Sequence, residues 1–401
     1  MKIGIIREGK IPADARVPLS PEQVILLSKK EQINIVVQPS DVRAYSDQEY
    51  LNAGCHLSED LSDCDILLGV KEVPISMLIP DKTYFFFSHT IKEQPQNQPL
   101  LKACINKNIK LVDYEVITRE NGQRVIAFGK FAGMVGAHNA LWTYGQRTKK
   151  YNLSRMHTMK DYKAAKEEYK GLDLPQVKIV LTGAGRVANG AAEVLDNLGI
   201  QKVPALKYLY ENFDHPVYTQ INSFYYARRK DGRITDSVQD FFNNPAAYVS
   251  NFEYFYINSD IMINGIYWDN AAPAFFSKEE MSLDNFRIKV IADITCDIAP
   301  ESSIPSTSKA STIDNPVFGY NRFSHKETEP YLEETVDMMT IDNLPSELPR
   351  DASKAFGDMF ILHVAPELFA EKSTMLENAT ICENGELGKK FQYLKNYLAG
   401  Q

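Results

Sequence analysis

The chain has 401 residues, enough for two or three domains of ordinary size. With 44% apolar and 24% charged residues its composition is that of a globular protein, which excludes disordered, collagen-like and low-complexity classes. The formal net charge of −8 disfavours a broad cationic surface, so we expect small-molecule partners and neither nucleic acid nor a membrane.

The first 115 residues alternate short apolar runs with polar or helical stretches, a pattern typical of a parallel sheet with crossover helices. SPEQVILLSKK begins with a capping serine and a proline in its first turn and predicts a helix, and QPLLKACINKN predicts another. The pair Asn121-Gly122 predicts a tight turn, with QRVIAF at 123–128 as one arm of a hairpin. Strands are predicted near 2–6, 33–38, 65–70, 83–87 and 109–114.

The composition changes after the hairpin. Residues 129–147 carry small and apolar side chains at helical spacing, which predicts a helix packed closely against another backbone and leading out of the first domain. A strand at 177–182 then opens a second α/β unit, whereas the aromatic-rich segment 212–256 is interpreted as an insertion. Residues 344–368 are predicted to be helical and to return the chain to the first domain. Further strands of the second unit are predicted near 261–264, 288–292 and 337–341.

The strongest local motif is a strand followed by GAGRVANGA and a helix. In a dinucleotide fold the first glycine, Gly183, permits a tight turn, and the second, Gly185, lets the backbone approach a pyrophosphate. Small residues at Ala188 and Gly190 let the helix meet the strand. The motif therefore predicts a dinucleotide cofactor.

The choice between NAD(H) and NADP(H) stays open. The acidic residue that usually binds the ribose is not visible at the end of the next predicted strand, where residues 202–207 read KVPALK. Its absence leaves the 2′-hydroxyl without an obvious acceptor. It also permits a 2′-phosphate, which Arg186 or Lys207 would meet.

Four ionisable residues of the first domain come directly after predicted strands: Arg7, Lys71, His89 and Glu115. Because the carboxyl ends of parallel strands share one edge of the sheet, we expect these side chains to form a cluster there. Alone, each would be read as a solvated loop residue; together they predict a binding cleft.

Two arginines are candidate carboxylate binders. Arg16 lies in the loop DARVPLSP before a helix start, and Arg124 lies on the predicted hairpin arm, where pairing across the strand is an alternative. A cofactor facing a lysine, a histidine and arginines suggests oxidation of an amine that carries carboxylates. Such a reaction needs a base for the proton on nitrogen and a second group to activate water, and Lys71 and His89 are the candidates.

The segments GVKEVP, FFFSHTIKEQ, KLVDYEVITRENGQRVIAFGKFAGMVGA, INGIYW and TIDNLPSELPRDAS resemble the lysine-forming saccharopine dehydrogenases. They particularly resemble the lysine-ketoglutarate reductase half of aminoadipic semialdehyde synthase. The resemblance covers nearly the whole chain and is looser over 200–260 and after about residue 370. It implies an oxidoreductase that interconverts saccharopine with L-lysine and 2-oxoglutarate by means of NAD(H) or NADP(H).

The resemblance also implies roles for single residues. Lys71 and His89 correspond to the acid-base groups, Arg16 and Arg124 to the carboxylate binders, and Glu115 to an acid that tunes the lysine. Asp342 corresponds to a residue near the cofactor at the domain junction.

The implied fold is α/β, with two Rossmann-like domains of parallel strands. The dinucleotide-binding domain, residues 131–344, is inserted into a discontinuous substrate domain built from residues 1–130 and 345–401.

The wider superfamily includes alanine dehydrogenase and the soluble part of transhydrogenase, which share the VKE and LP-x-x-x-PR elements. FSHTIKEQ and QRVIAFGKFAG favour the saccharopine branch. An alanine dehydrogenase-like enzyme and a non-catalytic dinucleotide-binding sensor are the alternatives. The physiological direction, the substrate if it is not saccharopine, the oligomeric state and the role of residues 212–256 stay open, and a homo-oligomer is compatible with the sequence.

Cysteine spacing and apolar runs bear on compartment. The five cysteines are widely spaced, with no CxxC pair, so we expect reduced thiols, no disulfide framework and no metal site. No apolar run has the length of a signal peptide or a membrane span, which predicts a cytoplasmic protein.

Overall fold

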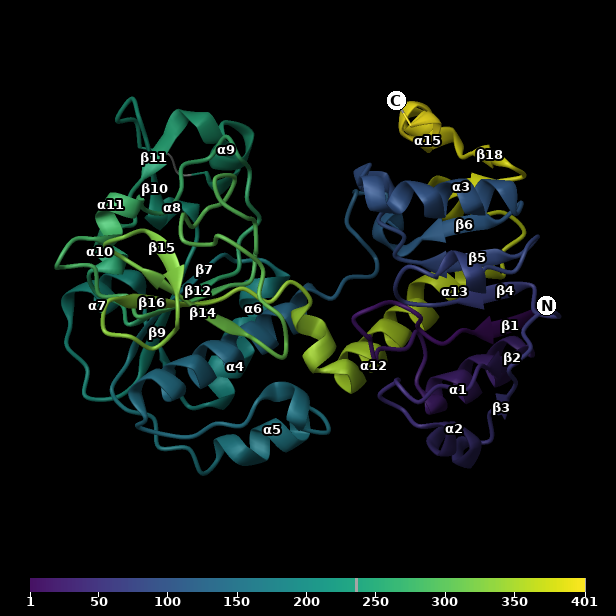
Figure 1. Ribbon diagram of the computed structural model, residues 1–401, viewed down its shortest axis with the longest axis horizontal. Helices are drawn as coiled ribbons and strands as arrows, with labels where there is room; N and C mark the ends of the chain where they lie inside the picture. The colour runs from purple at the N-terminus through teal and green to yellow at the C-terminus, as the bar shows by residue number, and fades with distance from the viewer. Residues whose placement is uncertain (235–236, 401) are drawn as a thin grey trace. The chain divides into compact units, whose positions relative to one another are not determined.

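The computed structural model describes residues 1–234 and 237–400, which form two compact units (Figure 1). Unit 1 combines Met1–Phe128 with Pro349–Gln401, and unit 2 is Gly129–Leu348. Each unit is built on a largely parallel sheet with helices packed on it. The predicted α/β class with two largely parallel sheets is confirmed.

The sheet of unit 1 has the strand order β18-β17-β6-β5-β4-β1-β2-β3 among the described residues. The six strands from β6 to β3 are parallel. Strand β17 runs antiparallel to β6, so the C-terminal segment of the chain adds strands to the sheet that the N-terminal segment forms. The strands are β1 (Lys2–Ile5), β2 (Asn34–Val37), β3 (His56–Leu57), β4 (Ile66–Leu68), β5 (Thr83–Phe86), β6 (Lys110–Asp113), β17 (Thr380–Glu383) and β18 (Glu386–Leu387). The helices are α1 (Pro21–Glu31), α2 (Asp47–Ala53), α3 (Gln98–Asn106), α12 (Pro349–Met359), α13 (Ala365–Leu368), α14 (Thr374–Ala379) and α15 (Lys395–Ala399).

Alternation of side chains along the strands divides the core of unit 1 between the two faces of the sheet. One cluster joins Ile5 of β1 to Leu27 of α1 and Phe356 of α12. The other joins Leu67 of β4 to Leu101 of α3, together with residues of the C-terminal segment. The sheet is therefore covered on both faces, as parallel sheets require.

Two local predictions in unit 1 can be compared with the structure. Ser20 caps α1 through a capping box with Gln23, as the sequence predicts. The hairpin predicted with Asn121-Gly122 as its turn is present but shorter than predicted: Gly122 donates to the carbonyl oxygen of Arg119, and a single antiparallel bridge joins Thr118 and Arg124. Beyond that bridge, Val125 and Ile126 turn into the core instead of extending a ladder.

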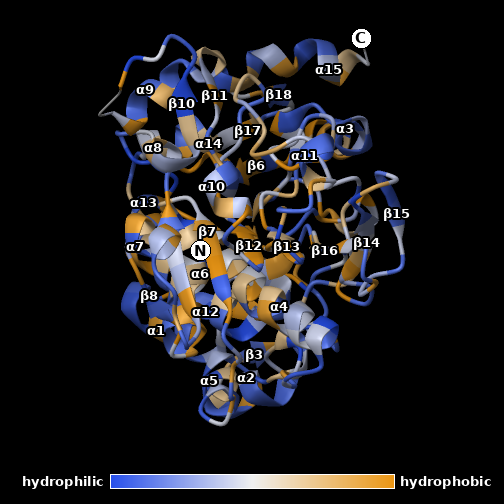
Figure 2. Cartoon of the chain, turned by 90° about the vertical axis from the view of Figure 1, so that its left-hand side faces the viewer, coloured by the Kyte–Doolittle hydropathy of each residue, from blue (hydrophilic) through white to orange (hydrophobic). Residues whose placement is uncertain are grey.

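The sheet of unit 2 has the order β15-β14-β16-β13-β12-β7-β9-β8, again among the described residues. Its central strands β7, β12 and β13 are apolar and buried (Figure 2). The strands are β7 (Lys178–Thr182), β8 (Gln201–Lys202), β9 (Val217–Ile221), β12 (Ile261–Asn264), β13 (Val290–Asp293), β14 (Val317–Asn321), β15 (Lys326–Thr328) and β16 (Thr335–Met339), with a separate pair, β10 (Ala227–Arg229) and β11 (Tyr248–Ser250). The helices are α4 (Gly129–Thr148), α5 (Tyr162–Tyr169), α6 (Arg186–Asn197), α7 (Ala205–Tyr210), α8 (Ser223–Tyr226), α9 (Val238–Asn243), α10 (Glu253–Tyr256) and α11 (Lys278–Met281).

The interpretation of 212–256 as an insertion is wrong for its first part. Residues Val217–Ile221 form β9, which pairs with β7 on one side and with β8 on the other. The alternating pattern VYTQI gave a weak strand signal next to a long aromatic stretch. The remaining described residues of the segment form short helices and the β10-β11 pair.

Helix α4 crosses α6 at very short range, as its small residues predict. A Cβ atom on Gly133 would lie 1.8 Å from the carbonyl oxygen of Val187, and one on Gly190 would lie 2.0 Å from that of Lys130. Glycine is required at both positions because a backbone atom occupies the space of the missing side chain.

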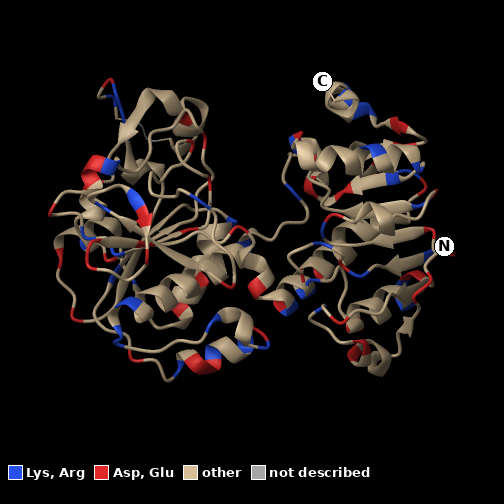
Figure 3. Ribbon diagram, in the orientation of Figure 1, with Lys and Arg blue, Asp and Glu red and all other residues tan. Residues whose placement is uncertain are grey.

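Two surface properties bear on partners. Lys, Arg, Asp and Glu are interspersed along helices and loops of both units (Figure 3). In the part of the chain that the structure covers, no helix is both long enough and apolar enough to cross a membrane.

Candidate active site

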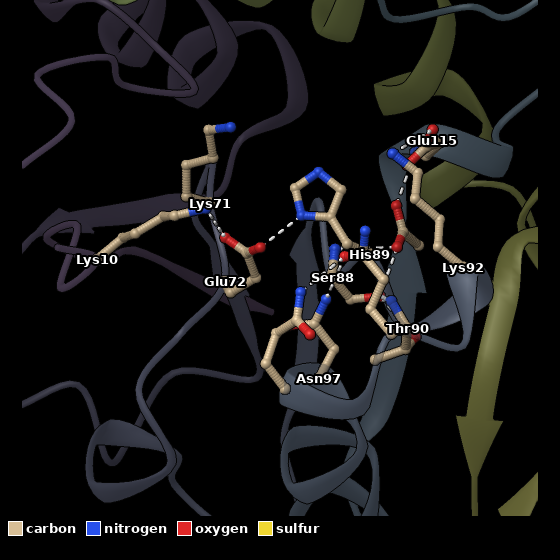
Figure 4. A network of polar contacts seen from close by, with 12 residues as sticks. Lys10, Lys71, Glu72, Ser88, His89, Thr90, Lys92, Asn97 and Glu115 are labelled. Carbon is tan, nitrogen blue, oxygen red and sulfur yellow. Dashed lines mark hydrogen bonds and ion pairs between the residues drawn. The ribbon is translucent and has the colours of Figure 1, made fainter. Parts of the chain in front are cut away.

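The carboxyl ends of β4 and β5 bring together a lysine, a glutamate and a histidine in unit 1. Lys71 and Glu72 follow β4, and His89 follows β5. Figure 4 shows the Lys71 ammonium and the second ring nitrogen of His89 on the same side of Glu72. The predicted convergence of the lysine and the histidine at one sheet edge is therefore what the structure shows.

Lys71 is half-buried, and its environment favours the neutral amine. Burial, then the positive charges of Arg16 and Lys10, lower the pKa of Lys71 to about 8. Asp14 and Glu72 oppose this shift. Among the described residues no hydrogen bond or ion pair is found for the Lys71 ammonium group. The site therefore holds an amine that can exchange a proton near neutral pH.

Glu72 links the lysine side of the site to the histidine. Its Oε1 lies 2.5 Å from His89 Nδ1, and its Oε2 accepts a hydrogen bond of 2.9 Å from Lys10 Nζ. Although burial opposes it, the bonds from His89 and Lys10 lower the pKa of Glu72 to about 2. An ionised carboxylate only accepts hydrogen bonds, so Nδ1 of His89 donates to Glu72 and Nε2 is the ring nitrogen that is left for substrate or water.

The loop that carries His89 is held by hydrogen bonds to the buried Asp113. The backbone N–H and the hydroxyl of Ser88 both donate to Oδ2 of Asp113, at 2.9 and 2.5 Å, and Asp113 is fully buried. His89 itself adopts a left-handed conformation with φ of 54°. Backbone strain of this kind at a non-glycine residue is typical of functional sites and persists because the surroundings hold it.

The two predicted carboxylate binders both contact acids of the chain. Arg16 is buried and forms a two-bond pair with Asp14, with Nε to Oδ1 at 2.9 Å and Nη2 to Oδ2 at 2.6 Å. Arg124 pairs with Glu115, whose Oε1 also lies 3.5 Å from Lys92 Nζ. The acids that act on the Lys71 pKa are Asp14 and Glu72, and the tuning role of Glu115 stays a prediction.

Sequence reasoning missed Glu8, Lys10, Asp14 and Glu72 and overrated Arg7. Arg7 pairs with Glu59 and bonds to Pro39, whereas the next residue, Glu8, reaches the lysine loop. The sequence held a signal for Glu8. In extended backbone successive side chains point to opposite faces, so Arg7 and Glu8 could not both be expected on the same side of the sheet.

In unit 2, the loop between β7 and α6 has the geometry of a pyrophosphate cradle. Gly183 has φ of +104°, and a Cβ there would lie 2.6 Å from the carbonyl oxygen of Gly265, so only glycine fits. Gly185 caps α6 and has open space beside it, since a Cβ would meet nothing within 4 Å. Ala188 is buried against Gly183 and Gly265. These features fit a dinucleotide, whose phosphates would meet the N-terminus of α6.

Two residues predicted to lie at the cofactor have protein neighbours of their own. Gly190 lies against Lys130 of α4 and so serves helix packing. Lys207 belongs to α7 and pairs with Glu211, beyond the edge strand β8. Arg186 is exposed in the first turn of α6 and stays a predicted phosphate contact.

The strand beside β7 is β9, so the strand end at which a ribose contact is expected is that of β9 and not residues 202–207. Gln220 of β9 donates to the carbonyl oxygen of Gly183 and to Asn189, at 3.1 Å each, and accepts 2.7 Å from Lys202 Nζ. The residue that follows β9 is Asn222. Because β9 is not the next strand along the chain, the segment searched for an acid was not the neighbouring strand.

A buried polar chain crosses the carboxyl ends of β7, β12 and β13. Thr182 donates to Asn264, which donates to Asp293 at 2.9 Å. Burial raises the pKa of Asp293, which also accepts from Thr307. Asp342 is exposed and lies close enough to Cys296 to raise the pKa of that thiol, after burial and Asp293.

Comparison with known proteins was made at three levels. Residues 4–135 match the model of the alanine dehydrogenase/PNT N-terminal domain. The chain is 31% identical over 441 residues to the mitochondrial alpha-aminoadipic semialdehyde synthase of Bos taurus, an alignment that covers 97% of this chain and 47% of that protein. It is 25% identical over 400 residues to the saccharopine dehydrogenase (NAD(+), L-lysine-forming) of Schizosaccharomyces pombe, covering 94% of each chain.

The solved structure of an L-alanine dehydrogenase superimposes with a TM-score of 0.65 at 16% identity, covering 100% of this chain and 99% of that one, which shows a shared fold. The chain spans about half the length of the aminoadipic semialdehyde synthases that it matches. The sequence-based resemblance is thus confirmed: the chain is similar over nearly its whole length to the lysine-forming saccharopine dehydrogenases and to the aminoadipic semialdehyde synthases, and its residues 4–135 match the alanine dehydrogenase/PNT N-terminal domain.

Proposed function

We propose that this protein is an oxidoreductase that interconverts saccharopine with L-lysine and 2-oxoglutarate by means of a nicotinamide cofactor. The observation that carries the proposal is the half-buried Lys71 beside the Glu72–His89 pair, in a chain whose relatives bear that activity in their names. The NAD(+) named for the S. pombe relative supports NAD(H) as the cofactor, with NADP(H) as the alternative.

Lys71 is proposed as the base for the substrate nitrogen. Its neutral amine Nζ takes the proton from the secondary ammonium of saccharopine, so that the nitrogen lone pair can form the imine as hydride leaves the neighbouring carbon. The lowered pKa matters because an ordinary lysine would be almost wholly protonated at neutral pH.

His89 is proposed as the group that handles water. Nε2 accepts a proton as water adds to the imine carbon, and Glu72 at Nδ1 stabilises the positive charge that the ring then carries. Histidine held by a carboxylate is the arrangement that serves as a base in many hydrolytic sites. The C–N bond then breaks as the leaving nitrogen takes a proton back from the Lys71 ammonium and the new hydroxyl gives up its proton to form the carbonyl, so that lysine leaves and 2-oxoglutarate remains.

The carboxylates of saccharopine require cationic partners. Arg16 and Arg124 are proposed to attract them, with Glu115 orienting Arg124. Lys10 and Lys92 add positive charge beside Glu72 and Glu115.

The cofactor is proposed to bind unit 2 through Gly183, Gly185, Ala188 and Arg186, with Asp342 near it. When bound, the nicotinamide supplies the acceptor or donor for hydride. We accordingly assign unit 1 as the substrate domain and unit 2 as the dinucleotide-binding domain. A cytoplasmic location, amino-acid and 2-oxo-acid substrates and a homo-oligomeric state are part of the same proposal.

A substrate panel tests the proposal. Saccharopine oxidation and the reverse condensation of lysine with 2-oxoglutarate are measured with NAD and NADP, beside alanine oxidation as the control. Turnover of saccharopine at least a hundredfold above alanine supports the assignment. Preference for alanine, or dinucleotide binding without turnover of any of these substrates, contradicts it.

The pH dependence should follow the Lys71 amine. Because its pKa is lowered to about 8, the base is protonated below that pH and neutral above it. We expect kcat/KM for saccharopine oxidation to rise about tenfold per pH unit up to about pH 8 and then to level off. Initial rates from about pH 6 to about pH 10 check this, and a profile that is flat around pH 8 would count against Lys71 as the base.

The substitution Gly185→Ala should weaken dinucleotide binding without changing the stability of the fold. In Gly185→Ala the new Cβ meets no protein atom, so we expect the melting temperature to stay unchanged. A pyrophosphate that lies against this backbone would be displaced, so the Kd for the dinucleotide should rise at least tenfold in calorimetry. An unchanged Kd would show that the phosphates bind elsewhere.

A further inference from the structure

The backbone that carries Lys71 runs beyond the end of β4, where the sheet ladder changes. Gly69 still donates to the carbonyl oxygen of Phe85, and the carbonyl oxygen of Val70 still accepts from Phe87. The N–H groups of Val70 and Lys71 bond instead to one side chain. Val70 donates to Oε1 of Glu8 at 2.6 Å, and Lys71 donates to Oε2 at 2.8 Å.

Glu8 reaches this position from the neighbouring strand. The chain leaves β1 at Ile6, whose N–H donates to the carbonyl oxygen of Leu68, and Glu8 then lies over Gly69, where a Cβ would be 3.6 Å from its Oε1. Burial raises the pKa of Glu8 to about 8 even though both backbone bonds oppose the shift. A carboxyl kept in such a place must be stabilised by what it holds.

We propose that Glu8 is a positioning residue that fixes the backbone of Val70 and Lys71 and thereby determines where the Lys71 ammonium lies. The inference rests on the function proposed for Lys71 and deepens it. Two N–H groups held by one carboxylate fix the peptide plane before Lys71 and hence the direction of its Cα–Cβ bond. Proton transfer depends steeply on such geometry.

The charged groups around Lys71 and Glu8 determine in which direction the pKa of Lys71 should change when Glu8 is replaced. Lys71 is faced by Arg16, Lys10, Asp14 and Glu72, and Glu8 is faced by Asp14 and Arg16. Around pH 8, where Glu8 is about half ionised, removal of its negative charge alone would lower the pKa of Lys71 further. If its anchor is lost, the ammonium moves toward water, burial is relieved, and the pKa rises toward the ordinary lysine value.

The experiment titrates Lys71 directly in the full chain. Lysines are reductively methylated with carbon-13 formaldehyde, and the Lys71 signal is assigned by its loss in Lys71→Met. In Glu8→Gln, which keeps the size of the side chain but offers one acceptor, we expect the Lys71 pKa to rise by about one unit. We also expect kcat for saccharopine oxidation to fall at least tenfold, with KM changed less than threefold.

Asp65→Asn is the matched control. Asp65 also binds a backbone N–H between the same two strands, that of Lys2 at 2.7 Å, but at the amino end of β4. It should leave the Lys71 titration unchanged. A fall, or no change, of the Lys71 pKa in Glu8→Gln overturns the proposal, because the first indicates charge alone and the second a purely structural bond.

A second measurement uses the unmodified protein, so its result does not depend on whether the Glu8→Gln variant folds. Amide hydrogen exchange at Val70 and Lys71 should be as slow as at Ile6 inside the ladder, and exchange as fast as in an exposed loop overturns the proposal. The two failures are distinguishable. A Lys71 that titrates and responds to Glu8→Gln in a protein without saccharopine turnover would refute the proposed function and leave the positioning role standing.

Discussion

Replacing Lys71 by methionine should lower kcat for saccharopine oxidation by a factor of about a hundred to ten thousand, the usual contribution of a positioned acid-base group. Methionine has nearly the length of lysine and no proton to exchange. The protein should fold at least as well, because burial of the ammonium is unfavourable in the first place. The bend near pH 8 in the rate profile should vanish with the lysine.

Dinucleotide binding separates loss of chemistry from loss of structure in that variant. The glycine loop belongs to unit 2, so the Kd for NAD or NADP should stay within about twofold. Lys82→Met is a matched control, since Lys82 is a half-buried lysine directly before β5, at the opposite edge of the same sheet. If Lys71→Met turned over as fast as the parent protein, the mechanism would be refuted.

The strands of unit 1 could be predicted closely because their signal is local. A run such as KIGII is apolar throughout, as a strand covered on both faces must be, and β1 was found at Lys2–Ile5. The hairpin arm predicted at 123–128 is shorter in the structure for a tertiary reason. Its β-branched residues favour a strand, but packing of Val125 and Ile126 in the core overrode that preference.

Strand β9 shows where topology limits a sequence-based prediction. Reading along the chain makes β8 the neighbour of β7, whereas the sheet places β9 between them. The five residues of β9 lie beside a long aromatic segment and carry alternating polarity instead of an apolar run. The ribose-binding position was therefore sought at residues 202–207, although Gln220 and Asn222 stand where β9 ends.

The candidate site was predictable in its strand-end residues and not in its partners. Lys71 and His89 could be found because each directly follows an apolar strand. Which charge stabilises which group depends on loops that fold back, as with Asp14 beside Arg16, and periodicity does not contain that information. Glu72 was visible as the neighbour of Lys71, but its bond to His89 depends on how two strands are aligned.

The pKa values of Lys71 and Glu72 are both lowered, but the causes differ, and this leaves a neutral base beside a fixed negative charge. Burial acts on both, and it favours the neutral amine and the neutral acid alike. Two hydrogen bonds reverse the effect for Glu72, whereas Lys71 has cations for neighbours and keeps the shift. Neighbouring groups pushed in this way toward a neutral base and a fixed charge are what acid-base catalysis requires.

Alanine at Gly190 should destabilise unit 2, although alanine is the better helix former. Helix propensity alone would favour Gly190→Ala by about 1 kcal/mol. The new Cβ, however, would lie 2.0 Å from the carbonyl oxygen of Lys130, a backbone atom that moves only if α4 and α6 separate. Because α4 is buried along most of its length, separation disturbs many contacts, and we expect a net loss of about 1 to 3 kcal/mol in the free energy of unfolding.

Thermal and urea unfolding of Gly190→Ala, read beside Gly171→Ala, decides whether close packing or propensity prevails. Gly171 follows α5 and a Cβ there meets nothing within 4 Å, so its substitution should change the free energy of unfolding by less than about 0.5 kcal/mol. A gain of stability in Gly190→Ala would mean that α4 and α6 lie farther apart than the structure has them. A loss confined to Gly190→Ala, beside a fold-neutral Gly185→Ala, would divide the glycines of GAGRVANG by role: Gly190 for the helix crossing and Gly185 for the ligand.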